Sequence, residues 1–166
     1  MIIRPETPAD RGSIRAILIA AFANHPYSRQ TEHLIVEALR ADNALTLSLV
    51  AEVDGAVVGQ IAFSPVTIGG EDAGWLALGP VAVAPSHQRR GIGTALVGEG
   101  LKTIRSSGIK GCVLVGDPAF YRRFGFVHNG ALRMEGVPPE VLLCLPFSGT
   151  APDGNVTHHP AFFVAE

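Results

Sequence analysis

The chain has 166 residues, of which 47% are hydrophobic and 17% are charged, and its formal net charge is −2 at pH 7. This length and apolar content suffice for a well-filled core, and because no linker or repeat divides the sequence we expect residues 1–166 to form a single domain. The slightly acidic balance argues against a nucleic-acid-binding protein, which needs a strongly basic face.

The N-terminal residues show no basic region followed by an apolar run, and no apolar segment of about 18 residues occurs in the sequence. We therefore expect neither secretion nor membrane insertion, and a cytoplasmic location. The two cysteines, Cys112 and Cys144, lie in apolar runs typical of strands. They are expected to be small buried hydrophobic residues rather than a disulfide.

The first predicted elements are a short strand at residues 2–4 and a helix that starts at Thr7, Pro8 and Asp10. Apolar residues at i, i+3, i+4, i+7 and i+8 give this helix one buried face, formed by Ile14, Ile17, Leu18, Ala21 and Phe22. A break at residues 24–27 separates it from a second helix over residues 31–41.

Three strands are predicted next. Apolar alternation indicates a strand over residues 45–52, and Asp54-Gly55 predicts a hairpin turn into a strand over residues 57–66. The third strand, residues 75–83, contains Gly79-Pro80. Because proline cannot donate to a β-ladder and glycine permits unusual backbone angles, we expect a bulge there.

Residues 78–97 have the pattern strand, loop, helix. Pro85 stops the strand, and a helical pattern begins at Gly91 and continues to Ser107. The free N–H groups of a helix start bind anions, glycine lets a phosphate approach the backbone, and arginines at positions 89 and 90 add positive charge. The pattern predicts a site for a phosphorylated cofactor, but it lacks the G-K-[ST] of a Walker loop and the third glycine of a dinucleotide fingerprint.

The remaining elements are less regular. A strand over residues 111–115 is expected to lie parallel to the strand over residues 75–83 through a right-handed crossover. Asp117-Pro118 predicts the start of a short helix. Two closing strands are predicted at residues 141–145 and 156–163.

Two segments resemble the GNAT N-acetyltransferase superfamily. The run Gln88-Arg89-Arg90-Gly91-Ile92-Gly93 is similar to its Q/R-x-x-G-x-G/A acyl-coenzyme A motif, and Phe120-Tyr121-Arg122-Arg123-Phe124-Gly125-Phe126 to its F-Y-x-x-x-G-F pattern. The resemblance covers roughly residues 57–126. It implies an α/β (α+β type) domain with a mixed, mostly antiparallel central sheet, one splayed pair of parallel strands, and about four flanking helices.

The resemblance also implies a site. Acetyl-coenzyme A would be the co-substrate, with its pantetheine arm in the gap between the splayed strands. The implied cofactor-binding residues are Val81, Ala82, Val83, Gln88, Arg89, Arg90, Gly91, Ile92, Gly93, Thr94 and Asp117. For catalysis it implies Tyr121 as general acid toward the coenzyme A sulfur, and the backbone N–H of Val81 can stabilise the thioester oxygen.

A general base is not evident. Some family members place a carboxylate on the central strand, whereas residues 75–78 here offer none. Candidates acting through water are Glu52, Glu71, Asp72 and His25. In the family the loop between the first two helices borders the acceptor site, so His25 and Tyr27 are also candidate substrate contacts.

The absence of an evident general base affects which amines the site is expected to accept. Neutralising a lysine-type amine of pKa about 10.4 at pH 7 costs ~4.6 kcal/mol, against ~1 kcal/mol for an α-amino group. A site without a strong base is therefore expected to prefer the α-amino group.

The sequence thus predicts an N-acetyltransferase that moves an acetyl group from acetyl-coenzyme A directly to an amine. The alternatives are a noncatalytic acyl-coenzyme A-binding sensor and an enzyme for longer acyl chains or a carrier-protein donor. The six histidines show no metal-ligand spacing, so no metal is expected. Acceptor identity and oligomeric state stay open, and a homodimer formed through the closing strands is one alternative.

Overall fold

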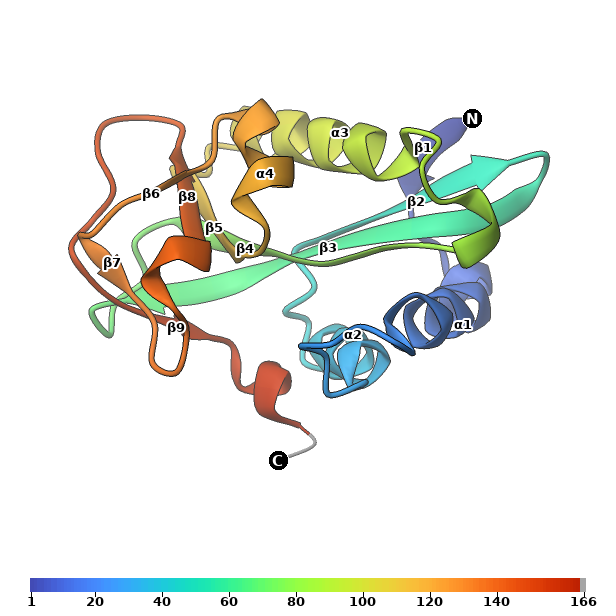
Figure 1. Cartoon of the computed structure of the whole chain (residues 1–166), viewed down its shortest axis with the longest axis horizontal. Coiled ribbons are helices and arrows are strands. Elements are labelled where there is room, and N and C mark those ends of the chain that lie inside the picture. Colours follow the sequence, from blue (N-terminus) through green and yellow to red (C-terminus); the bar gives the residue numbers. More distant parts are fainter. Residues whose placement is uncertain (165–166) are drawn as a thin grey trace.

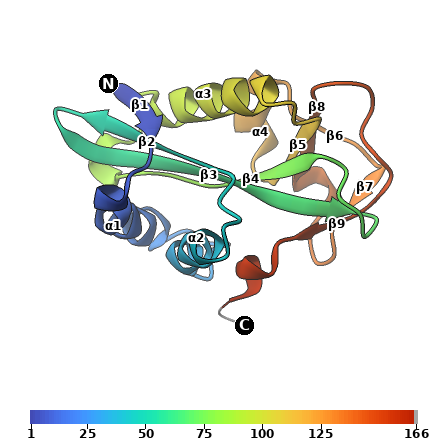
Figure 2. The ribbon, with the colours of Figure 1, turned by 180° about the vertical axis from the view of Figure 1, so that it is seen from behind.

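The structure is a computed structural model that describes residues 1–164; residues 165 and 166 of the predicted domain lie outside the described residues. A central sheet crosses the molecule (Figure 1). Helices α3 (Ile92–Ser106) and α4 (Pro118–Tyr121) lie on one side of it, and helices α1 (Arg11–Phe22) and α2 (Glu32–Ala41) on the other, as the view from behind also shows (Figure 2).

Within the described residues the sheet has nine strands: β1 (Ile2–Pro5), β2 (Leu47–Val53), β3 (Ala56–Ile68), β4 (Trp75–Val83), β5 (Gly111–Val115), β6 (Val127–His128), β7 (Leu132–Arg133), β8 (Leu142–Pro146) and β9 (Gly154–His158). The main order is β1-β2-β3-β4-β5-β8-β6, and β9 pairs with β3 and β7. The β4–β5 pair is parallel, as is the short β7–β9 pair, and the others are antiparallel. The predicted mixed, mostly antiparallel sheet is confirmed.

The β2–β3 hairpin forms where the sequence predicts it. Asp54 and Gly55 both have positive φ angles, 51° and 79°. Two successive left-handed residues give a turn whose twist matches that of the strands, and aspartate followed by glycine tolerates this conformation at little cost.

The predicted bulge in β4 is also confirmed. Ile61 of β3 pairs with Val81 and Phe63 pairs with Leu78, so Gly79 and Pro80 together face a single residue, Ala62. Gly79 has a φ of 135°, a backbone conformation that residues other than glycine rarely adopt.

The parallel strands part just before this bulge. β4 pairs with β5 only at Trp75, Leu76 and Ala77, opposite residues 111–113. From Leu78 onward β4 keeps its pairing with β3 but has none with β5. The predicted splay is therefore present, and it leaves a gap between the second half of β4 and the end of β5.

The core lies in two layers, one on each face of the sheet. Under α3 the buried cluster includes Ile61, Phe63, Leu78, Leu96, Leu101 and Leu114. On the other face α1 packs over Val50, Ala62 and Ala82, and a second cluster lies beneath β7 and β9, containing Val66, Ala77, Val113, Leu132 and Val156. Both cysteines are buried and free, as predicted.

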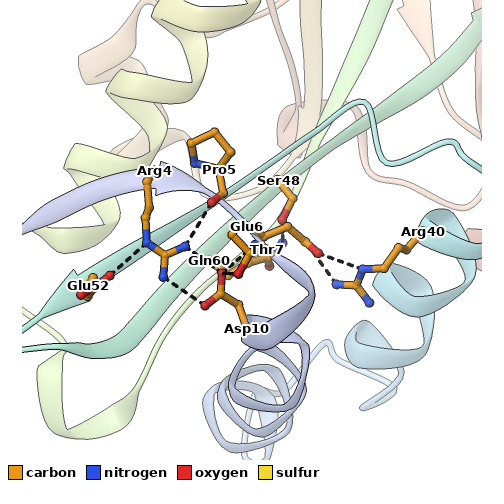
Figure 3. A network of polar contacts seen from close by, with 9 residues as sticks. All are labelled: Arg4, Pro5, Glu6, Thr7, Asp10, Arg40, Ser48, Glu52 and Gln60. Atoms are coloured by element: carbon orange, nitrogen blue, oxygen red, sulfur yellow. Dashed lines mark hydrogen bonds and ion pairs between the residues drawn. The ribbon is translucent and has the colours of Figure 1, made fainter.

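A polar network fixes the N-terminal segment and α2 against β2 (Figure 3). Arg4 donates from Nη1 to Asp10 at 2.8 Å and from Nε to Glu52 at 2.9 Å. Arg40 of α2 donates to Glu6 at 2.9 Å. The Arg4 guanidinium, together with the N–H and hydroxyl of Thr7, holds the pKa of the Asp10 carboxyl well below its usual range.

The C-terminal region differs from the prediction. The strand predicted over residues 156–163 ends at His158, and a 3-10 helix follows at Pro160–Phe163. Pro160 has no N–H for a ladder, and the Nδ1 of His159 accepts the Ala161 N–H at 3.0 Å, which caps the turn instead. β6 and β7, two residues each, were not predicted because such short runs carry no periodicity. None of the helices in residues 1–164 is long and apolar enough to cross a membrane.

Candidate active site

The gap between β4 and β5 exposes backbone hydrogen-bonding groups of β4. The Ala84 N–H donates to the Val58 carbonyl at 2.7 Å, so Ala84 and Val58 are a hydrogen-bonded pair of the antiparallel ladder. Hydrogen-bonded and non-hydrogen-bonded pairs alternate along an antiparallel ladder. The backbone N–H and carbonyl of Ala82 therefore bond to β3, whereas those of Val81 and Val83 point away from β3, toward the gap. The Val83 carbonyl illustrates this, because it accepts the side-chain amide of Gln88 at 3.0 Å.

The opposite wall of the gap has the same character. The Gly116 N–H donates to Val141 at 3.0 Å, so the same alternation along β5 directs the peptide groups of Val115 away from β8 and into the gap. An extended, amide-containing ligand arm can therefore bond to both walls much as an added strand would.

At the open end of the gap, the N-terminus of α3 borders a cavity of about 440 Å³. Its lining residues are Val83, His87, Gln88, Arg89, Gly91, Ile92, Gly93, Thr94, Phe120 and Arg123. Gly91 precedes α3 with a φ of 81°, and Arg89 has a φ of 64°. This turn leaves the N–H groups of the first helical turn facing the cavity, where an anion can bind them.

The cavity includes three residues outside the predicted set of site residues: His87, Phe120 and Arg123. Arg123 lies over the ring of Phe120, with Cζ 4.5 Å from its centroid, and its Nη1 is 3.5 Å from Thr94 Oγ1. His87 joins the lining beside Gln88. Arg90, which was predicted to bind the cofactor, is exposed and does not line the cavity.

At the closed end of the gap lies Tyr121, the last residue of α4. Its ring packs edge-on against Phe120 at 4.8 Å and Phe126 at 5.9 Å between centroids. The Sγ of Cys112 lies beside the backbone of Leu78, where β4 and β5 part, and it interacts electrostatically with the Tyr121 phenol. Burial, and secondarily this thiol, raises the pKa of Tyr121 to about 12.

This geometry has clear counterparts among known proteins. Residues 13–126 match the profile described as the "Acetyltransferase (GNAT) family". The chain belongs to the GNAT family of acetyltransferases. The prediction of a GNAT-type acyltransferase is thereby confirmed.

Individual GNAT proteins are similar over most of the chain. YhbS of Escherichia coli K12, an N-acetyltransferase described as uncharacterized, is 42% identical over 127 residues, which cover 76% of this chain and 73% of YhbS. A GNAT acetyltransferase from Brucella melitensis, solved with acetyl-CoA, is 50% identical with a TM-score of 0.88 and covers 97% of both chains. The structure of YhbS in complex with CoA has a TM-score of 0.89 and 34% identity, covering 99% of this chain and 93% of that one.

The acidic residues that the sequence suggested as a base in this GNAT protein do not converge on the gap. The Glu52 carboxylate is occupied by Arg4 at 2.9 Å, and that of Asp72 accepts the Gly74 N–H in the β3–β4 turn at 2.9 Å. Glu71 belongs to the same turn, with an N–H that donates to Ile68 at 3.3 Å. His25 lies on the α1–α2 loop with its ring 6.2 Å from that of Tyr27, which is 92% exposed.

Asp117, predicted to bind the cofactor, has another local role in this GNAT protein. Its carboxylate accepts the Ala119 N–H at 2.9 Å and so caps α4. Within residues 1–164, no three His, Cys, Asp or Glu side chains are grouped to hold a metal ion.

Proposed function

We propose that this protein transfers the acetyl group of acetyl-CoA directly to an amine. The observation that carries the proposal is the gap between β4 and β5, with an anion-binding cavity at its open end and Tyr121 at its closed end. The relatives solved with acetyl-CoA and CoA support the choice of co-substrate.

The cofactor would lie along the gap with its diphosphate in the cavity. The N–H groups at the start of α3, where Gly91 and Gly93 leave the backbone open, would bind the phosphate oxygens. Arg89 and Arg123, which both line the cavity, add positive charge. The pantetheine amides would bond to the peptide groups of Val81 and Val83, whereas Ala82 contributes through its buried side chain.

In this arrangement the acetyl group reaches the closed end, near Leu78 and Tyr121. The amine attacks the thioester carbonyl, and the Val81 N–H donates to the oxygen as negative charge develops. A phenol of pKa about 12 would lose its proton to a thiolate of pKa about 8.5 only at a cost of ~5 kcal/mol. Tyr121 therefore acts as a hydrogen-bond donor to the leaving sulfur rather than as a full proton donor.

The acceptor class follows from the missing carboxylate. The carboxylates of Glu52 and Asp72 are held by Arg4 and by the Gly74 N–H, and Glu71 lies in the turn between β3 and β4, away from the second half of β4. None of the acidic side chains suggested by the sequence therefore stands at the gap to deprotonate an ammonium group. We propose that the acceptor is an amine of low pKa, such as an α-amino group, which is partly neutral at pH 7.

Thiol release from acetyl-CoA, measured with a panel of α-amines and matched ε-amines, tests this function. Preferential turnover of the α-amines supports the proposal, and a preference for ε-amines contradicts the acceptor class. If acetyl-CoA binds tightly but no amine is turned over, the protein is a noncatalytic sensor of acyl-CoA.

A further inference from the structure

Three buried side-chain atoms of the described residues have no hydrogen-bond partner: Gln60 Oε1, Ser64 Oγ and His158 Nδ1. Folded proteins rarely leave such atoms unpaired, and an exception calls for a bound water or a ligand. Gln60 belongs to the network of Figure 3 and is held there through its amide nitrogen, which donates to Ser48 at 3.0 Å. Ser64 and His158 lie outside that network.

The sheet register makes Ser64 and His158 neighbours. His158 of β9 pairs with Val66 of β3, so both side chains point to the same face. Ser64 precedes Val66 by two residues and therefore points to that face as well. Ser64 and His158 are thus diagonal partners on adjacent strands. The Cα atoms of such partners lie about 7–8 Å apart, a separation that a long side chain such as that of histidine can span.

The same register places Ser64 next to the gap. Ser64 pairs with Ala77 of β4, which is the last residue of β4 that pairs with β5. Neighbouring strands are about 4.8 Å apart, so the closed end of the gap begins one strand away from the Ser64 side chain. His158, Ser64 and the reacting end of the gap form a short diagonal path across the sheet.

This path lies on the face that the cofactor machinery leaves free. α3 and α4 lie on the opposite face, whereas β9 and the 3-10 helix after it lie on the same side as α1 and α2 (Figures 1 and 2). Along β3, Ser64 stands between Ala62, which α1 covers, and Val66, where pairing with β9 begins. An acceptor amine on this face of the sheet would meet the thioester on the side where Ser64 and His158 lie.

The imidazole of His158 is held in a fixed orientation. Its ring stacks on Phe162 with centroids 3.9 Å apart and an interplanar angle of 11°. Phe162 belongs to the 3-10 helix Pro160–Phe163, which His159 caps and which packs against α2. A fixed ring with an unpaired nitrogen is suited to receive a proton from one direction.

We propose that His158, together with Ser64, forms the proton-accepting side of the acceptor site. This inference rests on the proposed acetyl transfer to an amine. The acceptor nitrogen binds near Ser64 Oγ, and His158 Nδ1 accepts its proton directly or through one water.

The neutral amine forms the C–N bond and the C–S bond breaks, so that the amide and the coenzyme A thiolate are produced. One proton leaves nitrogen for His158 and then passes to solvent, while the thiolate, stabilised by Tyr121, takes a proton from solvent. Burial lowers the pKa of His158 to about 4, so the ring is neutral at pH 7. Such a weak base accepts the proton only as the C–N bond forms, because nitrogen then becomes acidic, and this agrees with an acceptor of low pKa.

The test compares His158→Gln and Ser64→Ala with wild type in steady-state thiol release, with acetyl-CoA binding followed by calorimetry. We expect His158→Gln to lower kcat by about 10²-fold and Ser64→Ala by a smaller factor, while acetyl-CoA affinity stays within twofold. His128→Gln, an exposed histidine on β6, serves as the matched control and retains the wild-type rate. Added imidazole should restore turnover to His158→Ala, which a merely structural role would not allow.

The outcomes separate this inference from the proposed function. If wild type turns over amines and His158→Gln does so equally fast with intact acetyl-CoA binding, His158 has no such role and the inference is wrong. If His158→Gln also loses acetyl-CoA binding, Ser64→Ala decides, and a wild-type rate in that variant overturns the inference. If wild type itself releases no thiol with any amine, the proposed function fails, and this inference fails with it.

Discussion

The ring of Tyr121 rests directly on Gly116, the residue that follows β5. A Cβ atom at Gly116 would lie 2.6 Å from Cε2 of Tyr121, closer than any side chain could stand. The missing side chain therefore sets how near the phenol can come to the closed end of the gap between β4 and β5. Gly116 has no side chain that could contact a substrate, so its role in the site is to leave room for the Tyr121 ring.

Gly116→Ala is expected to displace the Tyr121 ring and to lower kcat by roughly 10- to 100-fold, because small misplacements of a catalytic group weaken its action in the transition state. Acetyl-CoA affinity should change little, since the diphosphate cavity lies at the other end of the gap. Gly130→Ala is the control, because a Cβ there meets nothing within 4 Å. Equal kcat values for the two variants would contradict the role assigned to this contact.

A second close contact concerns stability rather than chemistry. A Cβ at Gly100 of α3 would lie 2.6 Å from the ring of Phe63, and both residues are buried. Gly100→Ala should lower the free energy of unfolding by ~1–3 kcal/mol through overpacking. Gly98→Ala, on the exposed side of the same helix with no neighbour within 4 Å, should raise it by up to ~1 kcal/mol. Urea unfolding of both variants checks the sign of each change.

The ion pair between Arg4 and Asp10 predicts a pH dependence of stability. The pKa of Asp10 is depressed in the folded protein, so its contribution is present above the unfolded value of about 3.9 and is lost as the pH falls below it toward the folded value. Asp10→Asn should lower the free energy of unfolding by ~1.5–3 kcal/mol at pH 7 and flatten its decline between pH 4 and pH 2. The same acid slope in wild type and variant would show that Asp10 does not carry this dependence.

Arg123 and Arg122 form a matched pair for the cofactor site. Arg123 lines the cavity at the start of α3, whereas Arg122 is exposed and lies outside it. Arg123→Ala should weaken acetyl-CoA binding by ~1 kcal/mol, about a fivefold rise in Kd that shrinks at high salt, and Arg122→Ala should not. Neither variant should change the binding of acetyl-pantetheine, which lacks the diphosphate. Calorimetry of both ligands checks this.

The sequence predicted the elements whose residues have only one reasonable conformation. Asp54-Gly55 specified the hairpin, Gly79-Pro80 the bulge, and Gly91 the start of α3, because each demands a backbone geometry that few residues accept. The relation of Ser64 to His158 could not be predicted. It depends on the pairing of β9 with β3 across about 90 residues of chain, which local periodicity does not encode.

Near the C-terminus the sequence predicted a strand that is longer than the one that forms. Residues 156–163 have the apolar character of a strand, yet Pro160 and the side chain of His159 turn the last four into a 3-10 helix. The proline was visible in the sequence, but the cap that replaces the ladder became evident only in the folded chain. Both Arg122 and Arg123 could be expected to meet the phosphates of coenzyme A, but which of them reaches the cavity depends on how the 3-10 helix Arg122–Phe124 packs beside α3.

The most direct test of the account is Tyr121→Phe, with thiol release measured on an amine that wild type accepts and acetyl-CoA binding measured by calorimetry on both proteins. The variant removes one hydroxyl and keeps the ring that packs against Gly116. We predict a fall in kcat of about 10²-fold with acetyl-CoA affinity unchanged, because the leaving sulfur loses its hydrogen-bond donor. Turnover at the wild-type rate with intact acetyl-CoA binding would contradict the proposed role of Tyr121 at the closed end of the gap.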